Sequence, residues 1–458
     1  MSNLNATMAT ALSGLLADQG ALETTTNNVA NSSTPGYSRE CPVLVPGDPV
    51  VEGPLTFGTG VVLQQVESVR DGILESRIQQ ETQQQGKQDA LLAALQQTQV
   101  NFSSSSGDIG SAISSFFNSI NQLSTNPSDL SLRQGVLTAA GNLATAFNQT
   151  AANLETQRTN LDLNVTQTVS QINQLTQQIA QLNGQISDLT NVGQNAGTFI
   201  DQRTQLIDQL SSLVDVSVIQ SDKSITLTTS NGTALVAGEQ AFQLAAQPTA
   251  ASVSDVVANG QDITAQLTGG KLAGLIQARD QEIPGVLANL DSLASGLADA
   301  VNQVQTTGYD LNGNLATGVN LFAPPPAGGV GAAASMSVAL TDPTKLAVSS
   351  DGSPGSNGNA EAMYAINNQA VAGNQTPTDY YSGIVFGIGN SVANATAEDN
   401  ASTLVLQQLN DQRGSISGVS LNEEAANLVQ YQEAYNAAAK VVTTISDMMQ
   451  TVINMKTT

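Results

Sequence analysis

The side chains that most often do chemistry in proteins are scarce in this sequence. Its 458 residues include no His and a single cysteine, Cys41. Without His, the commonest general base and the commonest zinc ligand are both missing. Cys41 lies between Glu40 and Pro42 and has no His to activate it, so a structural or neutral role is favoured over a reactive thiolate. We therefore expect no enzyme, no cofactor and no metal site.

Residues 310–314, Asp-Leu-Asn-Gly-Asn, suggest a calcium-binding loop at first sight. An EF-hand loop has Asp or Asn at alternate positions before its glycine and a glutamate at its end. This segment lacks both that order and the trailing Glu. A β-turn is therefore the favoured interpretation.

The charge and hydropathy of the chain exclude several kinds of partner. The net charge is −24, from 38 acidic and 14 basic residues. Nucleic acids and anionic membranes bind through Lys and Arg, so neither is expected as a partner. No apolar run approaches the roughly 20 residues that a membrane-spanning helix needs. The first basic residue is Arg39, which argues against a standard cleaved signal peptide.

Both ends of the chain carry apolar residues at the spacing of a coiled coil. Near the amino terminus, Met8, Leu15, Leu22 and Val29 recur every seven positions. Near the carboxyl terminus, spacings of three and four alternate along Leu428, Tyr431, Tyr435, Ala438, Val442, Ile445, Met449 and Val452. These patterns predict two amphipathic helices, each with a coiled-coil seam.

The second of these helices has a further apolar stripe beside its seam, formed by Ala434, Val441, Met448 and Met455. A helix with two stripes needs two packing partners. Chain ends are usually polar and frayed, so apolar ends indicate that something covers them. We predict that the two ends pair with each other and gain full order only among neighbouring copies of the chain. Asn422 is the expected N-cap of this helix.

A polar stretch at residues 27–39 ends the first helix. Pro35 and Gly36 occupy the second and third positions of the tetrapeptide 34–37, which favours a type II turn. The side chains of Asn31, Ser32 and Ser33 are common at helix ends and turns. The stretch therefore redirects the chain.

The longest helical pattern covers residues 128–191, with unbroken spacings of four and three between Leu161 and Leu189. A helix of this length would span about 95 Å, which suits a scaffold better than an active site. A second helix, over residues 198–214, is expected to pack back on the first.

Beyond this helix pair, alternating residues and the Asn-Gly step at 231–232 predict a hairpin within a small β insert at 216–268. Helix returns over 269–305, where Pro284 starts or kinks a segment. Residues 306–375 are rich in Gly, Pro, Ala and Ser, and helix resumes over 378–412.

The predicted fold is mainly α with β-rich inserts, and its domains are nested. The terminal coiled-coil helices, residues 1–36 and 415–458, form the inner domain. A long helical body consists of residues 37–214, 269–305 and 376–414. A β- and loop-rich outer insert consists of residues 215–268 and 306–375.

Several segments together resemble a known family. The first helix and the residues after it look like the amino-terminal signature of bacterial flagellar axial proteins, the rod, hook and hook-associated proteins. The residues that carry this signature are Asn28, Asn31, Pro35, Gly36, Tyr37, Ser38 and Arg39. Four further blocks are similar to the hook-associated members, namely residues 57–61, 201–210, 269–275 and 417–428. Each block alone is a weak match to the family, but five blocks in the expected order make a specific match.

The resemblance implies a structural adaptor that joins the flagellar hook to the filament and is required for filament assembly. The implied partners are other copies of the chain in a helical ring, the hook protein, the next hook-associated junction protein and an export chaperone. The implied location is extracellular, after type III export without a cleaved signal. The two seams and the turn would then be assembly residues.

Two alternatives stay open. The chain could be another axial protein, such as hook or distal rod. The segments 216–268 and 306–375 could also form a ligand- or surface-binding lobe carried on an axial scaffold.

Overall fold

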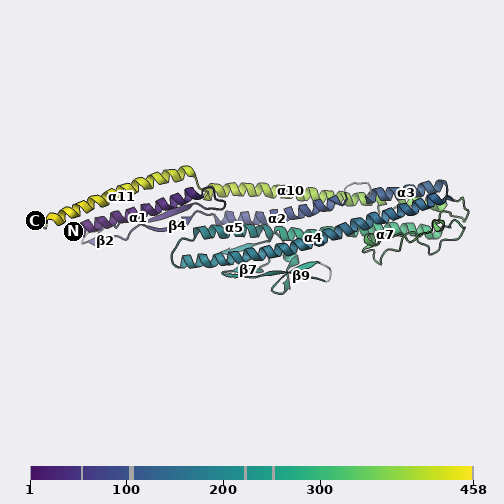
Figure 1. Ribbon diagram of the computed structural model, residues 1–458, viewed down its shortest axis with the longest axis horizontal. Coiled ribbons are helices and arrows are strands. Elements are labelled where there is room, and N and C mark those ends of the chain that lie inside the picture. The colour runs from purple at the N-terminus through teal and green to yellow at the C-terminus, as the bar shows by residue number, and fades with distance from the viewer. Residues whose placement is uncertain (1, 53–54, 103–107, 221–223, 250–252, 456–458) are drawn as a thin grey trace.

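The computed structural model describes residues 2–52, 55–102, 108–220, 224–249 and 253–455, and the molecule is a long, mainly helical rod (Figure 1). The helices are α1 (Ser2–Asn31), α2 (Gly72–Val100), α3 (Ile109–Thr125), α4 (Leu130–Asn191), α5 (Gly197–Leu213), α6 (Gly270–Gln277), α7 (Ile283–Thr307), α8 (Ala332–Ser335), α9 (Gly358–Ala365), α10 (Pro377–Ser417) and α11 (Leu421–Met455). The predicted fold class, mainly α with β inserts, is confirmed.

The helices of the body begin at side chains that cap their free backbone N–H groups. Asp71, Asp108 and Asp129 accept hydrogen bonds from the first turns of α2, α3 and α4. Thr376 does the same for α10, where Pro377 occupies the first turn and needs no N–H partner. These caps fix where the long helices start.

The helix α4 confirms the long helix expected at 128–191. It holds 62 residues, which corresponds to a length of about 93 Å. Along the predicted spacing, Leu161, Val165 and Ile172 are buried, whereas Leu175 and Leu189 are half-buried. The helix α5 packs back on it, as expected for 198–214.

The helix α3 lies within residues 108–126, for which the sequence predicts no element. This helix buries one face against α4, and its Phe116 ring lies 5.3 Å from that of Phe117 and 5.7 Å from that of Phe322. Its remaining residues are largely Ser and Asn, whose low helix propensity hid the apolar period.

The β insert predicted at 216–268 forms two small antiparallel sheets that pack on α4. The four-stranded sheet contains β5 (Ser217–Gln220), β6 (Ile225–Thr228), β7 (Ala234–Ala237) and β8 (Gln240–Ala241). The three-stranded sheet contains β9 (Leu244–Pro248), β10 (Ser254–Ala258) and β11 (Gln261–Asp262). Leu227, Leu235 and Val236 are fully buried and join the core of the helical body.

Between α6 and α7, residues Ala278–Glu282 form one π-helical turn, and Pro284 starts α7 as expected. The fully buried Arg279 projects from this turn. Its Nη1 donates to Asp162 Oδ1 on α4 at 2.6 Å and to the backbone oxygen of Ser254 on β10 at 2.7 Å. The guanidinium thus joins the turn, α4 and the β insert.

Residues 306–375 contain loops, α8, α9 and isolated β-bridges, and the structure places no named strand among them. Their apolar side chains, including Phe322 and Met363, are buried and belong to the same core as α3, α4 and α7. The many Gly and Pro residues explain why extended strands do not form here.

A two-stranded ribbon of β1 (Glu40–Pro46) and β4 (Val61–Ser68) lies along α1, and a smaller hairpin of β2 (Val50–Glu52) and β3 (Leu55–Phe57) extends it. The predicted domain division assigns these residues to the helical body, whereas the ribbon packs on the terminal helix. Gly60, whose φ is +103°, permits this contact because a Cβ there would lie 2.0 Å from Ser13 Oγ. The division into three domains remains a prediction.

Candidate assembly site at the paired termini

The two ends of the chain pair with each other. The helices α1 and α11 pack side by side and run in opposite directions, so both termini lie at the same end of the rod (Figure 1). Ser420 lies just before the first residue of α11. Its Oγ accepts from the backbone N of Glu423 at 3.5 Å, and its carbonyl accepts from the backbone N of Glu424 at 2.9 Å. Asn422, the predicted cap, lies inside the helix.

The predicted seam residues lie at or beside this contact to different extents. Ile445 is buried. Val29 and Val452 are exposed, with 37% and 40% of their surface accessible. The remaining members are half-buried in the single chain: Met8, Leu15, Leu22, Leu428, Tyr431, Tyr435, Ala438, Val442 and Met449. Their role in assembly remains a prediction.

The most buried residues of α1 are not the large apolar residues of the predicted seam but smaller ones. Ala17 and Ala21 are 2% and 0% exposed, and Thr24, Thr25 and Asn28 are also buried. Small side chains let α11 and the ribbon approach the α1 backbone closely. At Gly20, an added Cβ would lie 2.5 Å from Leu63 Cδ2 of β4. A search for large apolar residues at heptad spacing could not find this face.

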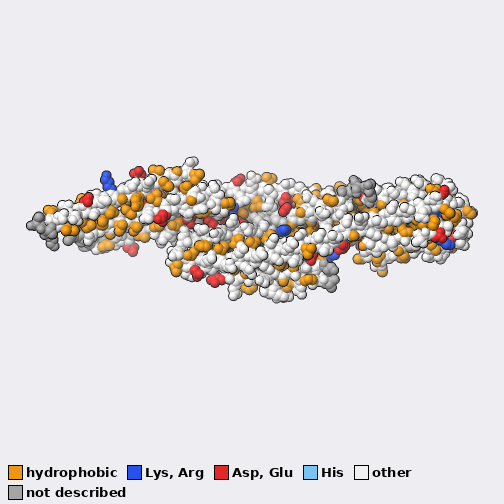
Figure 2. Space-filling view, in the orientation of Figure 1, with side chains coloured by type: hydrophobic (Ala, Val, Ile, Leu, Met, Phe, Trp, Pro, Cys, Tyr) orange, Lys and Arg blue, Asp and Glu red, His pale blue; other side chains and the backbone are white. Residues whose placement is uncertain are grey.

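An exposed apolar surface remains on the paired helices α1 and α11. We call it the terminal stripe, and it consists of Leu12, Leu16, Val29, Val429, Val441, Met448, Val452 and Met455, each at least 37% exposed. Figure 2 shows hydrophobic side chains gathered along this part of the molecule. Val441, Met448 and Met455 belong to the second stripe predicted for α11 and are exposed in the single chain, whereas Ala434 of that stripe is half-buried.

The turn after α1 has the predicted geometry. The backbone N of Tyr37 donates to the carbonyl of Thr34 at 3.2 Å, and Gly36 has a φ of +77°. A type II turn requires such a positive φ at its third position. Asn31 supports the turn, because its Oδ1 accepts from Thr34 Oγ1 at 3.2 Å and its carbonyl from the Thr34 amide at 2.9 Å.

Asn28 connects α1 to the turn and to α11. Its Nδ2 donates to the carbonyl of Glu40 at 2.8 Å and to Glu424 Oε2 at 3.1 Å. Its Oδ1 accepts from the backbone N of Glu40 and from the Tyr37 hydroxyl, both at 2.9 Å. Burial and three nearby carboxylates raise the pKa of Tyr37, so its phenol remains a donor at neutral pH. Asn28, 2% exposed, thus uses its full hydrogen-bonding capacity.

Ser38 and Arg39 connect the turn to the body and to α11. Ser38 donates from its backbone N and its Oγ to the Asp201 carboxylate on α5, at 3.1 and 2.8 Å. Arg70 completes this group, since its Nη2 lies 2.6 Å from Asp201 Oδ1. Arg39 pairs with Glu423 at 2.6 Å, and its backbone N donates to the carbonyl of Ser417 at 2.8 Å. We call this junction of residues 27–40, 70–75, 201–208 and 413–424 the elbow.

A second charged group lies in the elbow, at the end of α10. Arg413 Nη1 lies 3.6 Å from Glu75 Oε2 on α2 and 3.4 Å from Asp208 Oδ2 on α5. Burial raises the pKa of both carboxyls, and that of Asp208 reaches about 6. The sequence showed none of these pairings, because partners such as Ser38 and Asp201 stand more than 160 positions apart.

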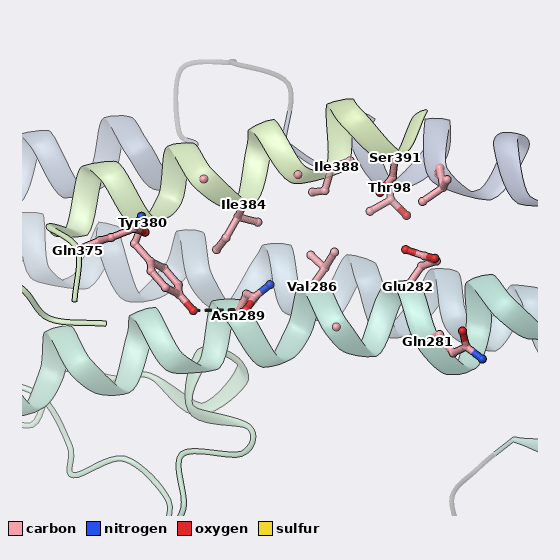
Figure 3. Close-up of a pocket in the computed structure, with 14 residues that line it drawn as sticks. Thr98, Gln281, Glu282, Val286, Asn289, Gln375, Tyr380, Ile384, Ile388 and Ser391 are labelled. Atoms are coloured by element: carbon pink, nitrogen blue, oxygen red, sulfur yellow. Dashed lines mark hydrogen bonds between the residues drawn. The ribbon is translucent and has the colours of Figure 1, made fainter. Parts of the chain in front are cut away.

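The groove between α7 and α10 offers no catalytic arrangement among the residues described in its lining. In the 470 Å³ groove between α7 and α10, the Tyr380 hydroxyl donates to Asn289 Oδ1 at 3.3 Å (Figure 3). Ile384, Ile388 and Val286 form much of the wall, and Glu282 is the one charged residue in its described lining. Such a lining contains no nucleophile paired with a base.

The segment 310–314 forms a turn rather than a calcium loop. Asp310 Oδ1 accepts from the backbone N of Asn312 and of Asn314, each at 2.9 Å, and its Oδ2 pairs with Lys345 Nζ at 3.1 Å. Within the described ranges, no group of three or more Cys, Asp or Glu side chains is placed to hold a metal ion. None of the helices described there is long and apolar enough to cross a membrane.

Comparison with family models gives one match to each part of the rod. Residues 95–322 match the flagellar hook-associated protein FlgK helical domain. Residues 8–37 match the flagella basal body rod protein family, and residues 412–455 match the carboxyl-terminal family of the flagellar basal body rod FlgEFG proteins. The paired termini and the body therefore each carry flagellar signatures.

Whole-chain comparison extends these matches. Flagellar hook-associated protein 1 of Bacillus subtilis is 30% identical, over 98% of this chain and 97% of the relative. The Escherichia coli protein of that name is 26% identical, over 97% and 99% of the two chains. The solved structure of the flagellar hook junction protein FlgK from Burkholderia pseudomallei has a TM-score of 0.68 and 19% identity, over 75% of this chain and all of that one. It shares the fold. Identity at this level over nearly the full length of both chains shows that the chain belongs to the flagellar hook-associated protein 1 family.

Proposed function

We propose that this chain is the structural adaptor that joins the flagellar hook to the filament through packing between subunits. The terminal stripe is the observation that carries the proposal. Large apolar side chains exposed in number on a soluble monomer commonly mark a contact with another protein. Both helices of the pair contribute to the terminal stripe, so neighbouring copies of the same pair could cover one another in a ring.

The arrangement of the rod supports this mechanism. The terminal pair would form the inner part of a helical assembly, where neighbouring copies complete the packing of α11, and the helical body would form the shell around it. The hook protein and the next hook-associated protein would contact opposite faces of the ring. The long α4 and α10 supply stiffness, because a packed helix bundle resists bending. We propose no reaction for the chain.

Export and location follow from the same proposal. The chain would reach the hook tip outside the cell through the flagellar type III channel, without a cleaved signal. An export chaperone would hold α11 beforehand, because half-buried and exposed apolar residues such as Tyr431 and Met448 would otherwise promote aggregation. Its bound segment is expected within residues 421–455.

Deleting the gene tests the role directly. Electron microscopy should show bare hooks, and the medium should contain monomeric flagellin, because the filament has nothing on which to start. Intact filaments in the deletion strain would refute the proposal. An absence of hooks would indicate a hook or distal-rod component instead.

A point substitution tests the mechanism. Val442→Asp places a charge at the half-buried seam of α11, and Leu15→Asp does the same on α1. Either variant should be exported with a folded body yet fail to restore filaments. Thr443→Asp is the matched control, since Thr443 is exposed on the adjacent face, and it should restore filaments. Normal filaments with both seam variants would exclude the seam as an assembly contact.

A further inference from the structure

The elbow contains a cavity of about 320 Å³ whose charges are not balanced. It lies between the turn at residues 35–38, the start of α2, α5 and the last turns of α10. Two carboxylates line it, Glu75 and Asp208, together with the cations Arg70 and Arg413. Arg70 is already paired with Asp201 at 2.6 Å.

Arg413 is consequently the one cation left for two carboxylates. Neither of its contacts is short, at 3.6 Å to Glu75 Oε2 and 3.4 Å to Asp208 Oδ2. The side chains of Glu75 and Asp208 are only 16% and 25% exposed. Asp208 Oδ1 and the Oγ of Ser417, which is 6% exposed, are buried without a hydrogen-bond partner among the described residues. With both carboxylates ionised, the group carries one uncompensated negative charge.

A proton is the ligand that balances this group. From α2, Glu75 faces Asp208 as a like charge, and from α10 Arg413 faces it as the opposite charge. Burial, the largest influence, and the charge of Glu75 raise the pKa of Asp208 to about 6, although Arg413 acts to lower it. Arg70 and Asp201 form the next charged pair, and Tyr37 lines the cavity. A protonated Asp208 would leave Arg413 with a single carboxylate and a neutral cluster.

We propose that the elbow is a proton-sensitive joint, in which one proton held by Glu75 and Asp208 tightens the contact of the end of α10 with α2 and α5. The charged group lies close to the connection between α10 and α11, so its state affects how α11 is held. Arg413 lies four residues before Ser417, the last residue of α10, and residues 418–420 lead directly into α11. Loosening the end of α10 therefore changes how the terminal pair is held on the body.

Linkage fixes the direction and size of the effect. Opening the joint returns Asp208 to water, where its carboxyl has the ordinary pKa of 3.8. A proton is then bound more tightly in the closed joint than in the open one, so acid favours closing. Between about pH 7.5 and pH 5, the opening constant should fall about tenfold.

Hydrogen exchange of the purified full chain measures this constant. The amides of residues 413–417 are followed at about pH 5 and pH 7.5, and their rates are corrected for the intrinsic effect of pH. Their opening constants should exceed those of the centre of α4, because the joint opens locally, and should be about tenfold lower in acid. In Asp208→Asn, which mimics the protonated carboxyl, the constant should be low at both pH values.

The matched control is Asp188→Asn, which removes an exposed carboxylate from α4 and should keep the tenfold difference. Glu75→Gln provides a second test, since it removes the like charge and should also reduce the pH effect. The proposal is overturned if Asp208→Asn keeps the full pH difference, or if the wild-type chain shows none. It is also overturned if residues 413–417 exchange no faster than the centre of α4, because the joint would then not open separately.

Discussion

Replacing Asn28 by Ala should detach the terminal pair from the body. Asn28 makes four hydrogen bonds, to both backbone groups of Glu40, to Glu424 and to Tyr37. Each such bond contributes about 1 kcal/mol net, and each buried group left unpaired costs about 1–3 kcal/mol. Because Asn28, Glu40 and Glu424 are all less than 9% exposed, water cannot fully replace the lost partner. We expect a loss of about 3–6 kcal/mol in the docking of the pair.

The assay is hydrogen exchange along α1 and the start of α11, with α4 as an internal reference. A loss of 3 kcal/mol corresponds to opening that is more frequent by roughly a hundredfold. Asn28→Asp should be at least as damaging, because it removes both donors and places a second carboxylate beside Glu424.

Asn27→Ala is the matched control for this experiment. Asn27 is the neighbouring residue of the same type, but it is exposed, and its one bond to the ribbon is 3.3 Å long, to Glu40 Oε2. Its replacement should cost less than about 1 kcal/mol. If Asn28→Ala opened the pair no more than Asn27→Ala does, the hydrogen bonds of the elbow would not be what holds it.

Three further outcomes are expected from the same structure. Gly270→Ala should destabilise the body by more than about 2 kcal/mol in urea unfolding, because the φ of Gly270 is +72° and a Cβ there would lie 2.2 Å from the backbone N of Val214. The control is Gly285→Ala on α7, where a Cβ would meet no atom within 4 Å, and this change should be neutral or slightly stabilising. Gly60→Ala should loosen the ribbon from α1 and speed proteolysis of residues 40–68; equal proteolysis of the wild-type chain would contradict the close contact with Ser13. Because the pKa of Asp208 is raised, the folded chain holds its proton more tightly than the unfolded chain, and the free energy of unfolding falls as pH rises from about 4 through 6. Asp208→Asn should therefore raise the free energy of unfolding by up to about 3 kcal/mol at pH 7.5 and by little at pH 4. An unchanged free energy of unfolding at pH 7.5 would contradict the buried, unbalanced charge.

Those parts of the fold that depend on local pattern could be predicted from the sequence. The seam of α4, from Leu161 onward, is buried at the expected spacing because a helix repeats its apolar face whatever it packs against. The turn at Pro35 and Gly36 follows from backbone preferences of those two residues alone. In both cases the information lies within a few neighbouring positions.

What could not be predicted depends on contacts between distant segments. The buried face of α1 includes Ala17, Ala21 and Thr24, which are buried because a partner approaches them closely and not because they are strongly apolar. No local pattern in residues 40–68 indicates that the ribbon lies on α1. Gly20 and Gly60 show the reason only once the contact is known. The charged groups of the elbow join α2, α5, α10 and α11, which no local pattern relates.

The chemical difference between the terminal pair and the elbow explains how one chain can be both adaptable and well defined. Apolar contact between two helices depends on area and has little direction, so α1 and α11 could slide past each other by a heptad and still bury similar side chains. The hydrogen bonds of Asn28 allow one register alone, because Glu424 and Glu40 must both lie within 3.1 Å of its Nδ2. Of the chain's 14 Lys and Arg residues, Arg39, Arg70 and Arg413 all form ion pairs at this junction. Directional bonds at the elbow therefore fix how α1 and α11 are held on the body, whereas the apolar contact between these two helices does not by itself fix their register.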